Sequence, residues 1–573
     1  MKYFLQILFL SVLVLSSCKK ISEEKIVEAE TFVTEAAPIT AENAMVVSAR
    51  TEASKIGTEI LQKGGNAFDA MIATELALAV CYPYAGSLGG GGFMVYRTQY
   101  GEIGALDYRE KAPLAASRNM YLDKNGNFQP EKSTRGGLAV GVPANLAGLF
   151  AVHEKFGSLP IEILLEPVIQ LATKGFAVTQ MQAERFREFR EEFLTYNDGE
   201  FLFTENFQVG DTLKNPALAN TLIRISKNGR REFYGGETGK KLVDFLKSKG
   251  GIITLKDLEN YEAQWREPIV FSYKDLRIIS MSPPSSGGIC LAQILKMIEP
   301  YPISSFGHNS IEYIQLLAEA EKRAYADRSN YLGDPDFVEI PTDSLLSEEY
   351  LLRRMMNFSF EKATPSEEIS PGKIEGYESS ETTHYSIVDQ FGNAVSATIT
   401  LNSEYGSKLY AKELGFFLNN EMDDFSAKPG VPNVYGLTGG EANSIAPAKR
   451  MLSAMTPTIV EKNGELYMVV GTPGGATIIT SVLQTILNVY EFDMNMQQAV
   501  KAPRFHHQWL PDAIRYEKNR FDPSLIDALK DKGYPENKAA DPIIGKVDAI
   551  LILANGQLQA GADPRGDDTA AGF

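Results

Sequence analysis

The chain has 573 residues, of which 44% are hydrophobic and 23% are charged, an ordinary composition for a soluble globular protein. Its formal net charge is −17 at pH 7, and the sequence contains no long basic run. This charge argues against a nucleic-acid partner, because nucleic-acid-binding proteins gather Lys and Arg against phosphates. The length is sufficient for a large buried core or for several domains.

The N-terminus has the pattern of an export signal. Met1-Lys2-Tyr3 carries a positive charge, and the apolar stretch over residues 4–15 is shorter than the roughly 20 residues that span a bilayer. Leu15-Ser16-Ser17-Cys18 resembles a bacterial lipobox, in which the cysteine is lipidated and becomes the mature N-terminus. We expect residues 1–17 to be a lipoprotein signal peptide, and Cys18 to anchor an exported, periplasmic or cell-envelope protein to the membrane. The alternative is an ordinary signal peptide, or a short anchor, in which Cys18 is incidental.

Residues 18–42 are rich in Glu, Lys, Thr and Ala and predict a flexible tether. The folded part is expected to begin at about residue 43, just before Met45-Val46-Val47. Two helices are predicted next, over 53–62 and 67–80, since the glycines that follow the first are a usual helix stop.

A strand pair is predicted to follow a glycine-rich turn over residues 86–92. Its strands cover 93–96 and 103–108, and Arg109 stands at the end of the second. The middle third of the sequence is predicted to be mostly helical, with helical patterns over 164–172 and 311–325 and an interruption at 283–288.

The last part of the chain has strand patterns. Residues 361–381 are polar and predict an exposed linker, and strand alternation begins directly after them. Asn-Gly is a strong hairpin signal, and a helix is expected over residues 478–490. Antiparallel strands with helices on their faces predict a layered α+β sandwich. Three hairpins are expected, with turns at 389–393, Asn463-Gly464 and Asn555-Gly556.

Thr382 stands where the polar linker meets the first strand of these hairpins. The turn is centred on Phe391, so the register predicts that Thr400 faces Thr382 across the pair. Two facing hydroxyl groups can share a hydrogen bond. A plain pair of strand-forming threonines explains the same pattern without any catalytic role.

Two further segments contain residues suited to chemistry. The sequence 471–475, Gly-Thr-Pro-Gly-Gly, lies between a strand and a helix, where unpaired backbone N–H groups can hold an oxyanion. Its alternative is a simple tight turn. The acidic run 419–424 can hold an ammonium group or a metal ion, or can be a solvated loop.

The cysteine and histidine content gives no indication of a metal or another cofactor. The chain has five histidines and no Cys-x-x-Cys or His-Glu-x-x-His motif. Apart from Cys18 there are only Cys81 and Cys290, which we expect to be buried thiols, although the sequence leaves a disulfide between them open.

Several long motifs together resemble the γ-glutamyltransferase (γ-glutamyl transpeptidase) family, from about residue 43 to the end of the chain. The resemblance implies an N-terminal-nucleophile hydrolase fold, a four-layer αββα sandwich. The motifs, in chain order, are Ser87-Leu88-Gly89-Gly90-Gly91-Gly92, Leu106-Asp107-Tyr108-Arg109-Glu110, Thr382-Thr383-His384-Tyr385-Ser386, the run 418–440, Gly471-Thr472-Pro473-Gly474-Gly475 and the terminal run 567–573.

The resemblance also implies that a precursor cuts itself between Glu381 and Thr382. The products would be a large subunit, residues 43–381, and a small catalytic subunit, residues 382–573, which form a heterodimer. A threonine hydroxyl is a poor nucleophile without a neighbouring base, and the cut frees an α-amine whose ordinary pKa is about 7.7–8.0. Cleavage would therefore create the catalyst.

The family's roles carry over to matching positions. Thr382 would attack the γ-carbonyl of a substrate such as glutathione, with support from Thr400, and water or an amino acid or peptide would accept the acyl group. The N–H groups of Gly474 and Gly475 would stabilise the oxyanion. The residues expected to hold the substrate are Arg109 and Ser453 at the α-carboxylate, where Arg offers a forked donor, and Asn402, Glu421 and Asp424 at the α-ammonium.

One departure from the family pattern affects specificity. The family usually has two serines where this chain has Ser453-Ala454, so one hydroxyl is missing at the carboxylate end. Residues 429–440 correspond to the family's lid over the glutamyl pocket, which favours small γ-glutamyl substrates. The alternatives are a related acylase or poly-γ-glutamate amidase of the same fold, or a lipid-anchored binding protein that has lost catalysis.

Overall fold

The computed structural model describes residues 38–369, 382–428, 440–538 and 543–573. The chain divides into two units, Met1–Ala36 and Ala37–Phe573, and the whole described fold belongs to the second. The predicted signal peptide, Cys18, Glu381 and the expected lid up to residue 439 lie outside the described residues. Within the described part of the chain, no helix combines the length and apolar composition needed to cross a membrane.

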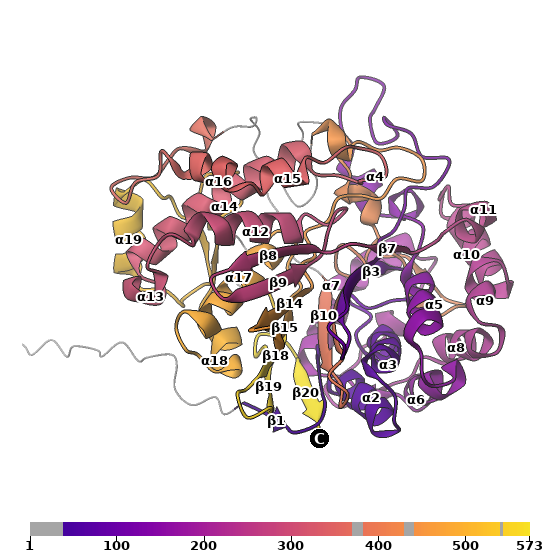
Figure 1. The fold of residues 1–573 in the computed structure, drawn as a ribbon. Helices are drawn as coiled ribbons and strands as arrows, with labels where there is room; N and C mark the ends of the chain where they lie inside the picture. The colour runs from indigo at the N-terminus through magenta and orange to yellow at the C-terminus, as the bar shows by residue number, and fades with distance from the viewer. Residues whose placement is uncertain (1–37, 370–381, 429–439, 539–542) are drawn as a thin grey trace, which may run out of the picture. The chain divides into compact units, whose positions relative to one another are not determined.

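Two antiparallel sheets of seven strands each form the centre of the second unit (Figure 1). The first sheet has the order β1 (Thr40–Ala41), β19 (Leu558–Ala562), β18 (Asp548–Ile552), β15 (Glu465–Gly471), β14 (Thr458–Lys462), β9 (Leu276–Ser280) and β8 (Ile269–Tyr273). The second has the order β20 (Thr569–Gly572), β2 (Met45–Ser48), β10 (Thr383–Val388), β11 (Ala394–Thr400), β3 (Gly91–Arg97), β4 (Ile103–Tyr108) and β7 (Gln264–Arg266).

The sheets face each other, and helices cover their outer faces (Figure 1). Successive side chains of a strand point to opposite faces, so Met45 and Val47 enter the core between the sheets, whereas Val46 enters the outer core beneath the helices. This arrangement is the four-layer αββα sandwich that the sequence predicts. The outer core of the β10 sheet includes α2 (Thr51–Gln62), α3 (Ala67–Cys81), α5 (Asn145–Phe156), α6 (Ile161–Lys174), α7 (Gln180–Tyr196), α8 (Pro216–Asn228), α9 (Arg230–Tyr234), α10 (Glu237–Ser248) and α11 (Leu255–Glu259).

The outer core of the β15 sheet has its own set of helices. Cys290 lies in this core and Cys81 in the other, and both are buried free thiols. The disulfide that the sequence left open is therefore absent. The helices are α12 (Gly287–Ile298), α13 (Ile303–Phe306), α14 (Ile311–Tyr331), α15 (Thr342–Leu345), α16 (Glu348–Met355), α17 (Thr477–Tyr490), α18 (Met496–Lys501) and α19 (Pro523–Asp531).

One expectation from the sequence is wrong. The tether was expected to extend to residue 42, but Thr40 and Ala41 form β1 and pair with β19, so the fold begins before that boundary. The middle third is mostly helical, as expected, and it also contributes β7, β8 and β9 to the two sheets. The hairpin of β8 and β9 turns at Lys274, whose φ of 51° is unusual for a residue other than glycine.

Candidate active site

The hairpin of β10 and β11 positions the predicted nucleophile. Thr383 pairs with Ile399 and Val388 with Ala394, which is the predicted register, and one further step along it places Thr382 opposite Thr400. Strand β10 also pairs with β2, so Thr382 stands at the start of an interior strand and is 5% exposed. Thr382 therefore has a fixed, nearly buried position where this interior strand begins.

Thr400 connects this end of the strand pair to the acidic run 419–424. Its hydroxyl accepts a hydrogen bond of 2.7 Å from the N–H of Asn402, and it lies close enough to the Glu421 carboxyl to lower the pKa of that group. A side chain at Gly90 would collide with the carbonyl oxygen of Thr400. The glycine-rich turn before β3 therefore allows the chain to approach Thr400 closely.

The glycine-rich turn after β15 lies beside the start of β10. Gly471 ends β15, and a side chain there would collide with the ring of His384, two residues after the nucleophile. Gly474 and Gly475 follow with φ values of +139° and +55°, which favour glycine. Among the described residues neither of their N–H groups has an acceptor. The turn that follows the contact of Gly471 with His384 therefore has two backbone donors without a partner among the described residues.

Arg109 and the acidic residues come together in one buried cluster. The Arg109 guanidinium lies 2.6 Å from Glu421 and 3.8 Å from Glu110, and it also pairs with Asp424. Arg109 is 1% exposed. The sequence analysis assigned Arg109 to the carboxylate of the substrate and Glu421 and Asp424 to its ammonium. In the structure these residues pair with one another directly, as buried charges require.

Electrostatics make this cluster attractive to a cation. Burial raises the pKa of Glu110 to about 8, although Arg109 opposes the shift. Burial likewise raises the pKa values of Glu421 and Asp424, again against the effect of Arg109. Burial lowers the pKa of Arg109, but Glu421 and Asp424 more than offset this and raise it. The raised pKa values mean that these carboxyl groups favour their protonated forms, and an ammonium group bound among them would favour the charged forms instead.

The remaining predicted residues border the same cluster. Asn402 donates its side-chain N–H to Asn420 O at 3.0 Å, which leaves its carbonyl oxygen as the acceptor that would receive an ammonium. Ser453 is 4% exposed, and its hydroxyl accepts the N–H of Met455 at 3.2 Å. Arg109 donates to the carbonyl oxygens of Met451 and Leu452, both at 3.4 Å. Contacts among the described residues thus connect most of the predicted site residues to this cluster, whereas Gly474 and Gly475 are placed only by the contact of Gly471 with His384.

Comparisons with known proteins agree with this geometry. The sequence model of the family described as Gamma-glutamyltranspeptidase matches residues 53–573. The chain is 45% identical over 541 residues to the glutathione hydrolase proenzyme of Escherichia coli (strain K12), which covers 94% of this chain and 93% of that protein. The chain belongs to the γ-glutamyltranspeptidase family. It is also 46% identical over 519 residues to the glutathione hydrolase proenzyme of Pseudomonas sp. (strain A14), with coverages of 89% and 90%.

Solved structures share the fold of this family member. The cephalosporin acylase from Bacillus halodurans has a TM-score of 0.84 at 24% identity and covers 94% of this chain and 97% of its own. At that identity the similarity concerns the fold alone. The Helicobacter pylori gamma-glutamyltranspeptidase has a TM-score of 0.56 at 45% identity, and the match covers 57% of this chain and 94% of that one. The predicted family and its N-terminal-nucleophile fold are confirmed.

Two buried residues that the sequence analysis did not single out bond to the strands that carry the predicted site residues. Glu75 of α3 accepts hydrogen bonds from Tyr108 at 3.0 Å and from Tyr385, and burial raises its pKa to about 8. His384 bonds to Thr398 at 2.8 Å and to Ser386 at 3.1 Å, and burial lowers its pKa to about 3. His384 is therefore neutral at physiological pH and lies with its ring nitrogens engaged. No local sequence signal marks Glu75, whose partners come from distant strands.

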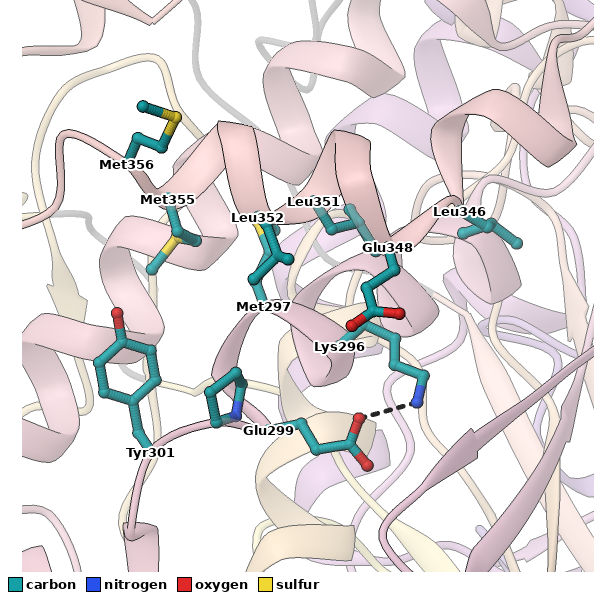
Figure 2. A pocket seen from close by; sticks show the side chains of 11 residues that line it. Lys296, Met297, Glu299, Tyr301, Leu346, Glu348, Leu351, Leu352, Met355 and Met356 are labelled. Atoms are coloured by element: carbon teal, nitrogen blue, oxygen red, sulfur yellow. Dashed lines mark hydrogen bonds and ion pairs between the residues drawn. The ribbon is translucent and has the colours of Figure 1, made fainter.

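A separate pocket of about 400 Å³ lies between α12 and α16 (Figure 2). Leucine and methionine side chains line most of it, among them Leu351, Leu352 and Met355. At its rim Lys296 and Glu299 form an ion pair of 2.7 Å. None of the predicted site residues lines this pocket.

Proposed function

We propose that this chain is the precursor of a γ-glutamyltransferase and glutathione hydrolase in which Thr382 is the nucleophile. The observation that carries the proposal is the position of Thr382 at the start of β10 and opposite Thr400, with Gly471 of the glycine-rich turn against His384 two residues further along the strand. Thr400 links the nucleophile to the cluster of Arg109 and Glu421. The relatives named glutathione hydrolase proenzyme support γ-glutamyl amides as the substrate class.

In this proposal the precursor cuts the bond between Glu381 and Thr382. The new α-amine of Thr382 then serves as the general base for the hydroxyl of the same residue. The proenzyme names of the relatives support such processing. So does the extent of the Helicobacter pylori match, because 57% of this chain accounts for 94% of that one, as expected if that chain is one processed subunit.

The chemical steps follow from the geometry. Oγ of Thr382 attacks the γ-carbonyl carbon while its proton passes to the α-amine, and Gly474 and Gly475 donate hydrogen bonds to the oxyanion. The C–N bond breaks, the amine product leaves with that proton, and a γ-glutamyl ester remains on Thr382. Water, or the amine of an amino acid or peptide, then attacks the ester and regenerates the hydroxyl. These steps use no cofactor.

Substrate selection rests on the charges of the cluster. The α-carboxylate and α-ammonium of a γ-linked glutamate sit on one carbon atom, so their protein partners must lie close together. Arg109 with Ser453 would hold the carboxylate, and Asp424 with Glu421 and the Asn402 carbonyl would hold the ammonium. An ordinary peptide bond to glutamate would remove one of these charges and would be rejected.

The decisive experiment removes the proposed nucleophile. Thr382→Ala should leave the chain uncut and abolish γ-glutamyl-anilide hydrolysis, because the variant lacks the hydroxyl that attacks the carbonyl and then carries the acyl group. A denaturing gel and an anilide assay measure the two outcomes. The matched control is Thr383→Val, since the buried Thr383 hydroxyl has no partner within the described chain and valine has nearly the same shape.

Mass spectrometry makes the result specific. The unmutated protein should give a fragment that begins at Thr382 and gains the mass of one γ-glutamyl group when mixed with a slow substrate. An active protein in which the bond before Thr382 remains intact would refute the proposal. Persistent full-length protein without anilide hydrolysis would instead indicate the non-catalytic binding protein.

A related acylase is the second candidate, and Ala454 favours it. The chain is 34% identical over 548 residues to a protein named Acylase ACY 1 proenzyme, from Pseudomonas sp. (strain V22). An acylase without γ-glutamyl selectivity should hydrolyse a glutaryl anilide, which lacks the α-ammonium, at least as well as a γ-glutamyl anilide. We expect the γ-glutamyl compound to have the higher kcat/KM, because the acidic cluster would otherwise face an uncharged carbon.

The location of the enzyme is part of the proposal. We infer export as a lipoprotein anchored through Cys18, on the basis of the lipobox resemblance in residues 15–18. The mature N-terminal peptide should carry lipid on Cys18, and Cys18→Ser should release the enzyme from the membrane fraction. An unmodified cysteine in the mature enzyme would exclude the anchor.

A further inference from the structure

Arg328, near the end of α14, is a buried cation that forms no ion pair with any described residue. It is 3% exposed, and its Nε donates a hydrogen bond of 2.8 Å to the hydroxyl of Ser286. Among the described residues, its two terminal nitrogens have no hydrogen-bond acceptor and no carboxylate within 4.0 Å. Burying an unpaired guanidinium is expensive, so such a residue indicates a place where an anion binds.

Arg328 and Arg109 are attached to the same segment, 451–454. Arg109 donates to the carbonyl oxygens of Met451 and Leu452. The next carbonyl, that of Ser453, accepts hydrogen bonds from the N–H and hydroxyl of Ser286, at 2.8 and 2.7 Å, and Ser286 in turn holds Arg328. Both arginines are thus connected to the segment that contains Ser453 and Ala454, Arg109 directly and Arg328 through Ser286.

The electrostatics of Asp424 place the charge of Arg328 next to the substrate site. Burial raises the pKa of Asp424, whereas the positive charges of both Arg109 and Arg328 lower it. Asn443 joins the same elements, because it donates to the Asp424 carbonyl at 2.7 Å and accepts from the Leu452 N–H at 3.0 Å. Arg328 therefore belongs to the surroundings of Asp424 and segment 451–454.

The two arginines differ in the charge they can offer a ligand. Arg109 is already surrounded by Glu110, Glu421 and Asp424, so its charge is balanced before any substrate binds. Arg328 has no such partner within the described chain. A carboxylate that entered between them would gain its net attraction from Arg328 and its forked hydrogen bonds from Arg109.

We propose that Arg328 is a specificity-determining residue that binds the α-carboxylate of the γ-glutamyl group, in place of the hydroxyl missing at Ala454. This inference rests on the proposed function and names a further residue of the same site. It explains how the pocket tolerates alanine at 454, because a charged group supplies the attraction that a second serine hydroxyl would provide.

The test combines charge-removing variants with three p-nitroanilide substrates. The γ-glutamyl compound has both charged groups, the glutaryl compound has only the carboxylate, and the 4-aminobutyryl compound has only the ammonium. Arg328→Met should raise KM about 10- to 100-fold for the first two, as expected for a lost charge-assisted hydrogen bond. It should change KM for the 4-aminobutyryl compound less than twofold. Arg328→Lys should recover most of the affinity, because it keeps the charge.

Two further variants separate binding from support of the fold. Ser286→Ala removes the anchor of Nε but keeps the guanidinium, so its KM should rise less than that of Arg328→Met for the γ-glutamyl compound. Ala454→Ser restores the hydroxyl and should lower KM more in the Arg328→Met background than in the unmutated protein. Arg328→Gln provides a second uncharged variant if the methionine variant is not processed into two fragments.

Two results would overturn the inference while leaving the proposed function intact. One is an equal rise in KM for all three substrates, and the other is an equal fall in kcat without selectivity for the carboxylate; either would make Arg328 a structural residue of α14. If the unmutated protein formed no acyl-enzyme on Thr382 with any of the three substrates, the proposed function itself would fail, and the inference with it.

Discussion

At Gly474 the backbone adopts a φ of +139°, and a side chain would collide with Oγ1 of Thr477. That hydroxyl and the Thr477 N–H both bond to the carbonyl of Gly474, at 2.8 and 3.0 Å, and so fix the turn before α17. Glycine is therefore required for the orientation of the two N–H donors. The identity of this single residue therefore decides whether the proposed oxyanion site would be preformed.

Gly474→Ala should lower kcat about 100-fold with little change in KM, because the N–H donors would shift away from the developing oxyanion rather than from the bound substrate. Steady-state hydrolysis of γ-glutamyl-p-nitroanilide measures both constants. Gly464→Ala is the matched control, since Gly464 also has a positive φ, of +83°, but nothing lies within 4 Å of an added side chain. Equal losses in the two variants would mean that backbone strain, not the oxyanion site, is responsible.

At the residue scale, the sequence predicted local relations better than distant ones. The pairing of Thr382 with Thr400 follows from the centre of one hairpin, and the structure has that register. Arg109 and Asp424 are separated by 315 positions, and only the fold brings them into contact. Arg328 had no signal at all, because a lone arginine in a helical pattern has the appearance of a surface residue.

At the element scale, α3, β4 and β10 meet around the carboxyl group of Glu75. Tyr108 at the end of β4 and Tyr385 in β10 both donate hydrogen bonds to it. These strands also carry Arg109 and Thr382 at their ends. Burial raises the Glu75 pKa from 4.5 to about 8, so the folded protein holds this group protonated at neutral pH.

Glu75 should make stability depend on pH. The unfolded chain releases the proton near pH 4.5 and the folded chain near pH 8, so the stabilising contribution is complete below about pH 4.5 and is lost as the pH rises to about 8. Glu75→Gln mimics the protonated form and should be more stable than its parent at pH 8, by on the order of a few kcal/mol, but not at pH 4.5.

Urea unfolding at the two pH values measures this difference. The Thr382→Ala background keeps parent and variant as one uncut chain, so unfolding is a unimolecular reaction. A parent whose stability is equal at pH 4.5 and pH 8, or a variant with the same pH slope as its parent, would contradict the assignment to Glu75.

At the element scale, the sequence predicted hairpins correctly where Asn-Gly marked the turn. Asn-Gly at 463–464 and at 555–556 indicated two hairpins, and both are present as β14–β15 and β18–β19. The β8–β9 hairpin was missed because it turns at Lys274-Asp275 without glycine or asparagine. Local propensity disfavours lysine with a positive φ, and tertiary packing overrides it there.

At the scale of the whole molecule, the strands of the two expected fragments alternate. In one sheet β2 of the large fragment lies between β20 and β10 of the small one, and β11 is followed by β3 of the large fragment. In the other sheet the small fragment's β19, β18, β15 and β14 lie between β1 and β9 of the large one. Each sheet therefore contains main-chain hydrogen bonds between the fragments at more than one boundary.

The processed protein should therefore behave as one particle. We expect a native mass that contains one copy of each fragment, or equal numbers of both, and no dissociation in 1 M salt, because the contacts are backbone ladders and apolar cores rather than surface ion pairs. Light scattering after gel filtration, with a denaturing gel of the same fractions, tests this. Separate elution of the two fragments under native conditions would contradict the interleaved sheets.

Because the strands of the two fragments alternate, the proposed cut would change how the molecule recovers from unfolding. Before the cut, a denatured chain can find its fold again by itself, since all fourteen strands belong to one polymer. After the cut, the same recovery requires two polymers to meet, so it becomes a second-order reaction that dilution disfavours. The mature enzyme would then owe its lifetime to slow unfolding rather than to reversible folding.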